Sequence, residues 1–193
     1  MADNFILEIY KNPQTVFTFK EISLFFPNLE YRSLKNKLYY AVSTHKLIKL
    51  RKGLYAKENF DFLEAAAKVY TPSYIGLETI LQKEGIVFQV YDTIFAISYL
   101  TRKIKIAGRG IFYRKMRMNI LLNDNGIIRE GNFCRASAER AFLDAVFLYK
   151  DYHFDNLKSL DWGKIEKMKK IYNSRSLEKR INQYHKIFKN ADD

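Results

Sequence analysis

The stretch of residues 30–57 changes its hydrophobic period abruptly, and this change constrains the fold more than any other feature of the sequence. Leu34, Leu38 and Ala41 recur at the spacing of one face of a helix. The sequence LIKLRKGLYA that follows contains two short β-prone runs separated by Gly53, which is typical of a hairpin. A helix followed directly by a hairpin is the order found in a winged helix-turn-helix.

The same stretch is strongly basic, since residues 31–57 carry eight Lys or Arg side chains and no Asp or Glu. In a winged helix-turn-helix the helix enters the DNA major groove and the hairpin lies along phosphates. A solvated basic face on an ordinary helix and hairpin is the alternative, but the order of elements and the absence of acids favour nucleic-acid binding. The predicted DNA-binding residues are Arg32, Ser33, Asn36, Lys37 and Tyr40 in the groove, and Lys35, Lys46, Lys49, Arg51 and Lys52 on phosphates. Tyr39 and Tyr40 fit core positions equally well.

Local signals upstream complete this pattern. The sequence predicts a helix over residues 2–11, a short strand over 15–18, a second helix over 19–26 and a third helix from residue 29. Thr18 and Glu21 have the spacing of a capping box, in which each side chain accepts a hydrogen bond from the other residue's backbone N–H. We therefore predict that residues 1–58 form a winged helix-turn-helix DNA-binding domain.

A second basic block lies well beyond this stretch. Residues 93–123 carry seven basic and no acidic side chains, within a chain whose net charge is +12. Lys103 and Lys105 alternate with isoleucines, so they share one face of a predicted strand. A solvated sheet face, a contact with an acidic partner and an additional nucleic-acid contact all remain open for this block. The predicted partner-binding residues are Arg102, Lys103, Lys105, Arg109, Arg114, Lys115 and Arg117.

The remaining sequence alternates between helical and strand patterns. Helices are predicted over residues 60–69, 73–84, 136–149, 161–172 and 176–188, and strands over 93–100, 103–107, 111–116, 127–130 and 132–135. In the predicted helix 73–84, Ile75, Leu77 and Ile80 would face the core. We therefore predict an α+β protein in which residues 59–193 form a mixed α/β C-terminal domain with a small, mainly antiparallel sheet and a helical tail.

Signals for catalysis or metal binding are weak. Cys134 is the only cysteine, so no internal disulfide can form, and a reduced cytosolic setting fits. His45, His153 and His185 are far apart and lack metal-ligand spacing. The N-terminus lacks the basic region of a signal peptide, and no stretch is long and apolar enough to span a membrane. We therefore expect no catalytic residue, no metal and no cofactor, and a cytoplasmic location.

Three segments in a fixed order resemble the AbiEi family, the antitoxins and transcriptional regulators of bacterial type IV toxin–antitoxin systems. These segments are LIKLRKGLYA, TPSYIGLETILQKEGI and ASAERAFLDAVFL. The resemblance runs from about residue 5 to residue 150. It implies an N-terminal winged helix that represses its own operon on double-stranded DNA, and a C-terminal domain that counteracts a nucleotidyltransferase toxin encoded beside it.

Two motifs of the family match individual residues of this chain. Tyr74, Gly76, Leu77 and Glu78 match the first motif, with Gly76 where Ser is more usual; Ser137, Glu139, Arg140, Ala141, Leu143 and Asp144 match the second, with Ala138 in place of Pro. We interpret most of these residues as helix packing and capping residues rather than catalytic ones. The resemblance does not extend to the tail from about residue 155 onward.

We therefore expect a DNA-binding autorepressor and antitoxin without catalytic activity, whose partners are operator DNA and the toxin or its substrate. It would lie in the bacterial cytoplasm, on the nucleoid. A nuclease-like enzyme, whose winged helix positions a catalytic C-terminal domain, is the alternative from another class. A third possibility is a winged-helix adaptor that binds protein alone.

Overall fold

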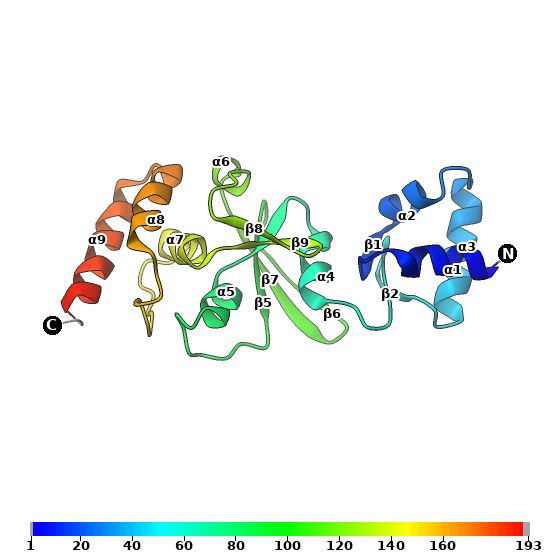
Figure 1. Ribbon diagram of the computed structural model, residues 1–193, viewed down its shortest axis with the longest axis horizontal. Helices are drawn as coiled ribbons and strands as arrows, with labels where there is room; N and C mark the ends of the chain where they lie inside the picture. Colours follow the sequence, from blue (N-terminus) through cyan, green and yellow to red (C-terminus); the bar gives the residue numbers. More distant parts are fainter. Residues whose placement is uncertain (1, 191–193) are drawn as a thin grey trace.

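The computed structural model describes residues 2–190. The molecule is elongated, with a helical segment at the N-terminal end, a sheet in the middle and a group of helices at the C-terminal end (Figure 1). We call residues 2–56 the head and residues 62–190 the body. The two chain ends lie at opposite ends of the molecule (Figure 1).

The head contains three helices and a small antiparallel sheet. Its elements are α1 (Ala2–Lys11), β1 (Val16–Thr18), α2 (Phe19–Phe25), α3 (Tyr31–Ser43), β2 (Ile48–Arg51) and β3 (Leu54–Ala56). The strand order is β1-β3-β2, and both pairings are antiparallel. The helices and strands predicted for this stretch are confirmed to within two residues at each end.

Two local features set the boundaries of these elements. The Thr18 hydroxyl accepts a hydrogen bond from the Glu21 N–H at 3.1 Å, and the Glu21 carboxylate accepts one from the Thr18 N–H at 2.7 Å. The predicted capping box is therefore confirmed at the start of α2. Gly53 has a φ of +76° between β2 and β3, a backbone conformation that glycine adopts without a steric penalty.

The head buries its own apolar cluster. α3 contributes the stripe that the sequence predicts, and α1 and α2 supply the facing side. The buried members are Phe5, Ile9, Phe17, Ile22, Leu34, Leu38, Ala41, Leu47 and Tyr55. Full burial of one large apolar side chain contributes about 1.5–3 kcal/mol, so this cluster holds the three helices against the small sheet.

The body is built around a larger, mixed sheet. Its elements are α4 (Phe62–Val69), β4 (Ser73–Ile75), α5 (Glu78–Lys83), β5 (Ile94–Ser98), β6 (Arg102–Ile106), β7 (Arg109–Lys115), α6 (Met118–Leu121), β8 (Ile127–Glu130), β9 (Phe133–Ala136) and α7 (Ala138–Leu148). The strand order is β6-β7-β5-β4-β9-β8. β5–β7 and β4–β9 are parallel pairs, and the other three pairs are antiparallel. The α+β class is confirmed, but the sheet is larger and more mixed than predicted.

The predicted helix over residues 73–84 is wrong in its first part. Residues 73–75 form strand β4, which pairs with β5 and β9, and the helix begins only at Glu78. Leu77 has a φ of 51°, so the chain turns sharply between the strand and the helix. Pairing with two strands that lie far away in sequence overrides the local helical period. Ile75 and Ile80 are nevertheless buried, as the pattern predicts.

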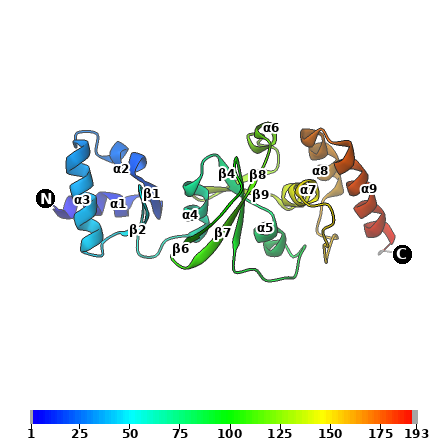
Figure 2. The same cartoon turned by 180° about the vertical axis from the view of Figure 1, so that it is seen from behind.

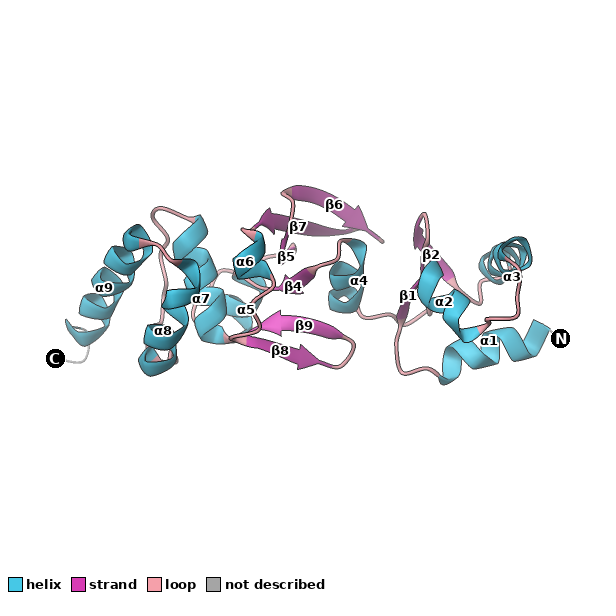
Figure 3. Ribbon diagram, turned by 90° about the horizontal axis from the view of Figure 1, so that it is seen from above, coloured by secondary structure: helices cyan, strands magenta, loops and turns pink. Residues whose placement is uncertain are grey.

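Helices cover the two faces of the large sheet. α4 lies on one face, where the Tyr113 hydroxyl of β7 donates to the Ala66 carbonyl at 2.7 Å. α5 and α7 lie on the other face, where the Tyr74 hydroxyl of β4 donates to the Asp144 carboxylate of α7 at 2.7 Å. The β6–β7 hairpin and the β8–β9 hairpin form opposite edges of the sheet, on opposite sides of the molecule (Figure 3).

The C-terminal tail is helical, as predicted. It consists of α8 (Trp162–Met168), the 3-10 helix η1 (Lys169–Tyr172) and α9 (Arg175–Asn190). These elements pack on α7 at the end of the molecule away from the head (Figure 2). Leu177 and Ile181 are buried there, and the Tyr184 hydroxyl donates to the Tyr152 carbonyl at 2.6 Å.

A buried polar network joins α7 to its neighbours. Arg140 and Asp144 are both fully buried, and the Arg140 Nε lies 3.4 Å from the Asp144 carboxylate. The Arg140 guanidinium also donates to the Ile120 carbonyl at 2.6 Å. The hydroxyls of Tyr74 and Tyr172 each donate to Asp144 at 2.7 Å. These contacts agree with the packing role that we predicted for the motif residues of this helix.

Polar contacts around α4 attach the head to the body. The Thr15 hydroxyl donates to the Glu64 carboxylate at 2.6 Å, and Glu64 is only 1% exposed. The Lys68 ammonium donates to the Val16 carbonyl at 2.6 Å and to the Glu21 carboxylate at 2.8 Å. Burial by itself would raise the pKa of the Glu21 carboxyl. The hydrogen bonds from Lys68 and from Thr18 together outweigh this effect, so the pKa lies below its usual value of 4.5.

Candidate nucleic-acid interface

Helix α3 presents a polar face to solvent along its whole length. Leu34, Leu38 and Ala41 point into the head, and the opposite side of the helix is open. The exposed side chains include Arg32, Ser33, Lys35, Asn36 and Tyr40 of the predicted set. Lys37 is half-buried, with its ammonium 5.8 Å from the centroid of the Phe5 ring.

The tyrosines of α3 lie on its surface. The exposed fractions of Tyr39 and Tyr40 are 78% and 55%, so neither is a core residue. Tyr31 at the start of the helix is 69% exposed and was not in the predicted set. Tyr31, Lys35 and Tyr39 are spaced by four residues, which places them on one strip of the helix. This spacing was visible in the sequence and would have added Tyr31 and Tyr39 to the candidate residues.

The β2–β3 hairpin presents the other predicted residues. Lys49, Arg51 and Lys52 are exposed, and so is Lys46, which precedes β2. The Arg51 guanidinium lies 5.5 Å from the centroid of the Tyr70 ring, so the hairpin also contacts the body. α3 and β2 lie on the same side of the head in the view of Figure 3.

Several of these cations have no acidic partner. Within residues 2–190, no ion pair joins Arg32, Lys35, Lys49 or Lys52 to a carboxylate. Their positive charge therefore acts on solvent and on any approaching polyanion. Clustered unneutralised cations on one face are the electrostatic signature of a phosphate-binding surface.

Lys57 has a different role from the other basic residues of this stretch. It is half-buried, and its ammonium donates to the carbonyls of Asn12 at 2.5 Å and of Tyr10 at 3.2 Å. Burial lowers the pKa of Lys57, and the nearby Glu64 carboxylate opposes this shift. Lys57 thus fixes the loop after α1 rather than facing solvent.

The second basic block is divided between the two faces of the large sheet. Lys103 is paired with Phe112 and Lys105 with Gly110 in the β6–β7 ladder, so both lysines share one face, as predicted. By the alternation of the strands, Arg114 shares that face, whereas Arg102, Arg109 and Lys115 lie on the other. Arg117 follows the end of β7. The seven predicted residues therefore do not form a single surface.

Aromatic rings accompany most of these cations. The Lys103 ammonium lies 4.8 Å from the Phe112 ring centroid, and the Arg114 guanidinium lies 4.8 Å from that of Tyr149. The Arg117 guanidinium lies 5.4 Å from the centroid of the Phe147 ring. Such cation–π contacts hold the cationic groups close to the protein surface.

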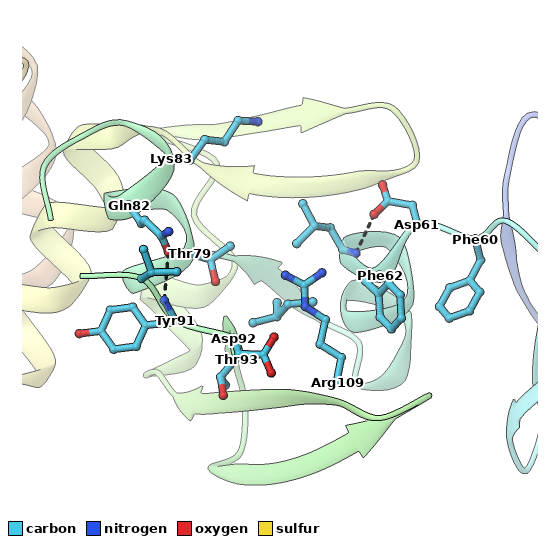
Figure 4. Close-up of a pocket in the computed structure, with 13 residues that line it drawn as sticks. Phe60, Asp61, Phe62, Thr79, Gln82, Lys83, Tyr91, Asp92, Thr93 and Arg109 are labelled. Carbon is cyan, nitrogen blue, oxygen red and sulfur yellow. Dashed lines mark hydrogen bonds between the residues drawn. The ribbon is translucent and has the colours of Figure 1, made fainter. Parts of the chain in front are cut away.

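Arg109 points into a separate hollow of about 800 Å³ between α4, α5 and the start of β5 (Figure 4). Its guanidinium lies 5.4 Å from the centroid of the Phe62 ring. Asp61 and Asp92 lie around the same hollow, and Asp61 caps α4 by accepting from the Leu63 N–H at 2.7 Å. The hollow thus carries both signs of charge, and Arg109 is set apart from Lys103 and Lys105.

Comparison of the sequence with models of known families finds no match, and comparison with curated proteins finds none. Among residues 2–190, no helix is long and apolar enough to cross a membrane. In the same part of the chain, no three His, Cys, Asp or Glu side chains are grouped so that they could hold a metal ion.

Proposed function

We propose that residues 1–58 form a winged helix-turn-helix that binds double-stranded operator DNA, with α3 as the recognition helix and β2–β3 as the wing. The order of elements, helix, strand, two helices and two strands around a small antiparallel sheet, supports this proposal. One observation carries it: α3 has an exposed polar face, and the hairpin that follows it along the chain carries cations, several of which have no acidic partner among residues 2–190.

The exposed side chains of α3 suit direct contact with base edges. Arg32, Asn36 and Tyr40 are spaced by four residues and therefore lie along one strip of the helix. An arginine pairs in bidentate fashion with guanine, and an asparagine with adenine, in the major groove. The wing cations, such as Lys49 and Lys52, would contact phosphates, which position the protein without reading sequence.

We further propose that the protein is an antitoxin that represses its own operon. This part of the proposal depends on the resemblance to AbiEi-type antitoxins. Residues 59–193 would counteract a nucleotidyltransferase toxin, by contact with the toxin or with its substrate. The basic residues of β6 and β7 and the C-terminal helices are the candidate contact surfaces. In this role the protein acts in the bacterial cytoplasm, without catalysis and without a cofactor.

DNA binding is tested by fluorescence anisotropy with labelled duplex DNA. We expect Arg32→Ala and Asn36→Ala to weaken binding to an operator fragment by about tenfold each, because each removes a base contact of about 1–3 kcal/mol. Lys20→Ala is the matched control, since Lys20 is an exposed cation on α2 of the same head. Binding is measured over a series of salt concentrations. If both α3 variants bind every duplex as tightly as the wild type does, α3 is not part of the interface.

The antitoxin role is tested by growth rescue. If the neighbouring gene encodes a nucleotidyltransferase, as the proposal requires, the protein is co-expressed with that enzyme and growth of the host is followed. We expect rescue by the wild type and by Arg32→Ala, because α3 would serve DNA and not the toxin. Failure of the wild type to rescue growth would refute the antitoxin role and leave DNA binding unaffected.

A further inference from the structure

A hollow of about 260 Å³ lies where the hairpin of the head meets the edge strand of the body. It brings together the two basic blocks, which are far apart in sequence. Its lining consists of Leu50 and Arg51 of β2, Tyr70 after α4, and Arg102, Ile104, Lys105 and Ile106 of β6. The lining thus contains three cationic residues, four uncharged ones and no carboxylate.

The position of this hollow is determined by contacts between head and body. The Arg51 guanidinium packs on the Tyr70 ring, with 5.5 Å between guanidinium carbon and ring centroid. On the opposite side of the head, the Asn132 amide donates to the Pro13 carbonyl at 3.3 Å. Together with the contacts of Lys68, these interactions fix the hairpin beside β6.

Arg102 belongs to the side of the sheet that faces the hollow. Its Cα pairs with that of Tyr113, so the two side chains share one face, and the Tyr113 hydroxyl bonds to α4 on that face. β6 is an edge strand, so no further strand covers it. Lys105 lies on the other face of the same strand and is also among the residues that line the hollow.

The charge of the hollow is not neutralised by the protein. Within residues 2–190, Arg51, Arg102 and Lys105 form no ion pair with a carboxylate. Like charges that converge on a partly apolar hollow repel one another and raise the local positive potential. A phosphate group placed among them would reverse this repulsion and gain charge-assisted hydrogen bonds from the guanidinium groups.

We propose that this hollow binds a backbone phosphate of the same duplex that α3 contacts, so that the DNA-binding surface extends from the head onto β6. The inference rests on the proposed DNA binding, and it assigns Arg102 to that surface as a phosphate contact. α3, β2 and β6 lie on one side of the molecule, which a single duplex can follow, whereas β8 lies on the other side (Figure 3). Bound DNA would contact head and body together.

The chain offers a closely matched control for Arg102. Arg129 lies on β8, the opposite edge strand of the same sheet, and both arginines are exposed. The β8–β9 hairpin also reaches the head, through Asn132. Arg102→Ala and Arg129→Ala therefore remove the same charge at similar positions relative to the head, on opposite sides of the molecule.

The experiment measures binding of the full chain to a labelled mixed-sequence duplex of about three helical turns over a series of salt concentrations. We expect Arg102→Ala to weaken binding about three- to tenfold at low salt and to reduce the slope of log K against log salt by about 0.9, the value for one lost phosphate contact. Arg102→Lys should recover most of the affinity, and Arg129→Ala should bind as the wild type does. Thermal melting of each variant checks that it is folded.

The outcomes separate this inference from the proposed function. If the wild type binds the mixed-sequence duplex and Arg32→Ala weakens binding to the operator fragment, but Arg102→Ala weakens binding to neither, the phosphate site is refuted and DNA binding by the head stands. Equal losses in Arg102→Ala and Arg129→Ala also refute the site, because they indicate a general effect of net charge. If the wild type binds no duplex, both proposals fail.

Discussion

The buried pair of Arg140 and Asp144 leads to a strong prediction about stability. Arg140→Met keeps an unbranched apolar chain at the position but removes the guanidinium. The variant leaves the Asp144 carboxylate buried without its cation, and breaking a buried ion pair in this way costs about 3–5 kcal/mol. The buried carbonyl of Ile120 also loses a donor, which adds about 1 kcal/mol. We therefore expect the free energy of unfolding to fall by about 4–6 kcal/mol.

This loss is large compared with the total stability of a domain, which is about 5–15 kcal/mol. It should decrease once the second charge is also removed, because an uncompensated charge is what makes the single variant costly. The double variant Arg140→Met with Asp144→Asn contains no buried charge at this position. We expect the double variant to lose at least 1 kcal/mol less free energy of unfolding than the sum of the losses of the two single variants, because changes at residues in contact are not additive.

The assay is urea unfolding followed by far-ultraviolet circular dichroism and by the fluorescence of Trp162, the only tryptophan of the chain. Arg180→Met is the control, because Arg180 is only half-buried and donates to two carbonyls, those of Tyr149 at 2.7 Å and Ser176 at 3.3 Å, with no buried carboxylate among its partners. Its loss should be about 1 kcal/mol. A loss below about 1 kcal/mol for Arg140→Met, or additivity of the two changes within about 0.5 kcal/mol, would refute the reasoning.

Three further predictions concern the head and the turns. The double variant Arg51→Ala with Lys52→Ala should weaken duplex binding on all sequences and reduce its salt slope by about 1.8, measured by filter binding; an unchanged slope would exclude the hairpin from the interface. The pKa of Glu21 is lowered below 4.5 in the folded protein, so its carboxylate stabilises the fold above pH 4.5, and this stabilisation is lost as the pH falls through the folded-state pKa. In thermal melts at stepped pH, Glu21→Gln should therefore show a smaller fall in melting temperature on acidification than the wild type. Gly126→Ala should destabilise more than Gly53→Ala in urea unfolding, since both glycines have a φ of +76°, but only at Gly126 would the new Cβ lie 2.7–2.8 Å from other side chains.

The capping box and the stripe of α3 show what short-range reasoning can achieve in this protein. Thr18 and Glu21 bond each other within one turn, so their spacing alone predicts the start of α2. The opposite holds for β4, where residues 73–75 have a local pattern that fits a helix. Their strand conformation follows from pairing with β5 and β9. No property of the segment by itself identifies those two partners.

The residues of the candidate site could also be predicted only in part from the sequence. The sequence identified the exposed cations of α3 and of the hairpin, because basic residues at solvent-facing positions are visible from helical spacing. It could not assign the second basic block, because the face on which each side chain lies depends on the register of β6 and β7. Nor could it show that Arg51 and Arg102 line the same hollow.

By itself, then, the sequence determined the order of the elements in the head, the polar face of α3 and the positive charge of the chain. These depend on residues that lie close together along the chain, whose spacing decides the outcome. Only the tertiary structure decided the strand order of the large sheet, the burial of Arg140 with Asp144, and the meeting of the two basic blocks beside the Tyr70 ring. These depend on which distant segments pack together, and that choice is made by the burial of apolar surface over the whole chain.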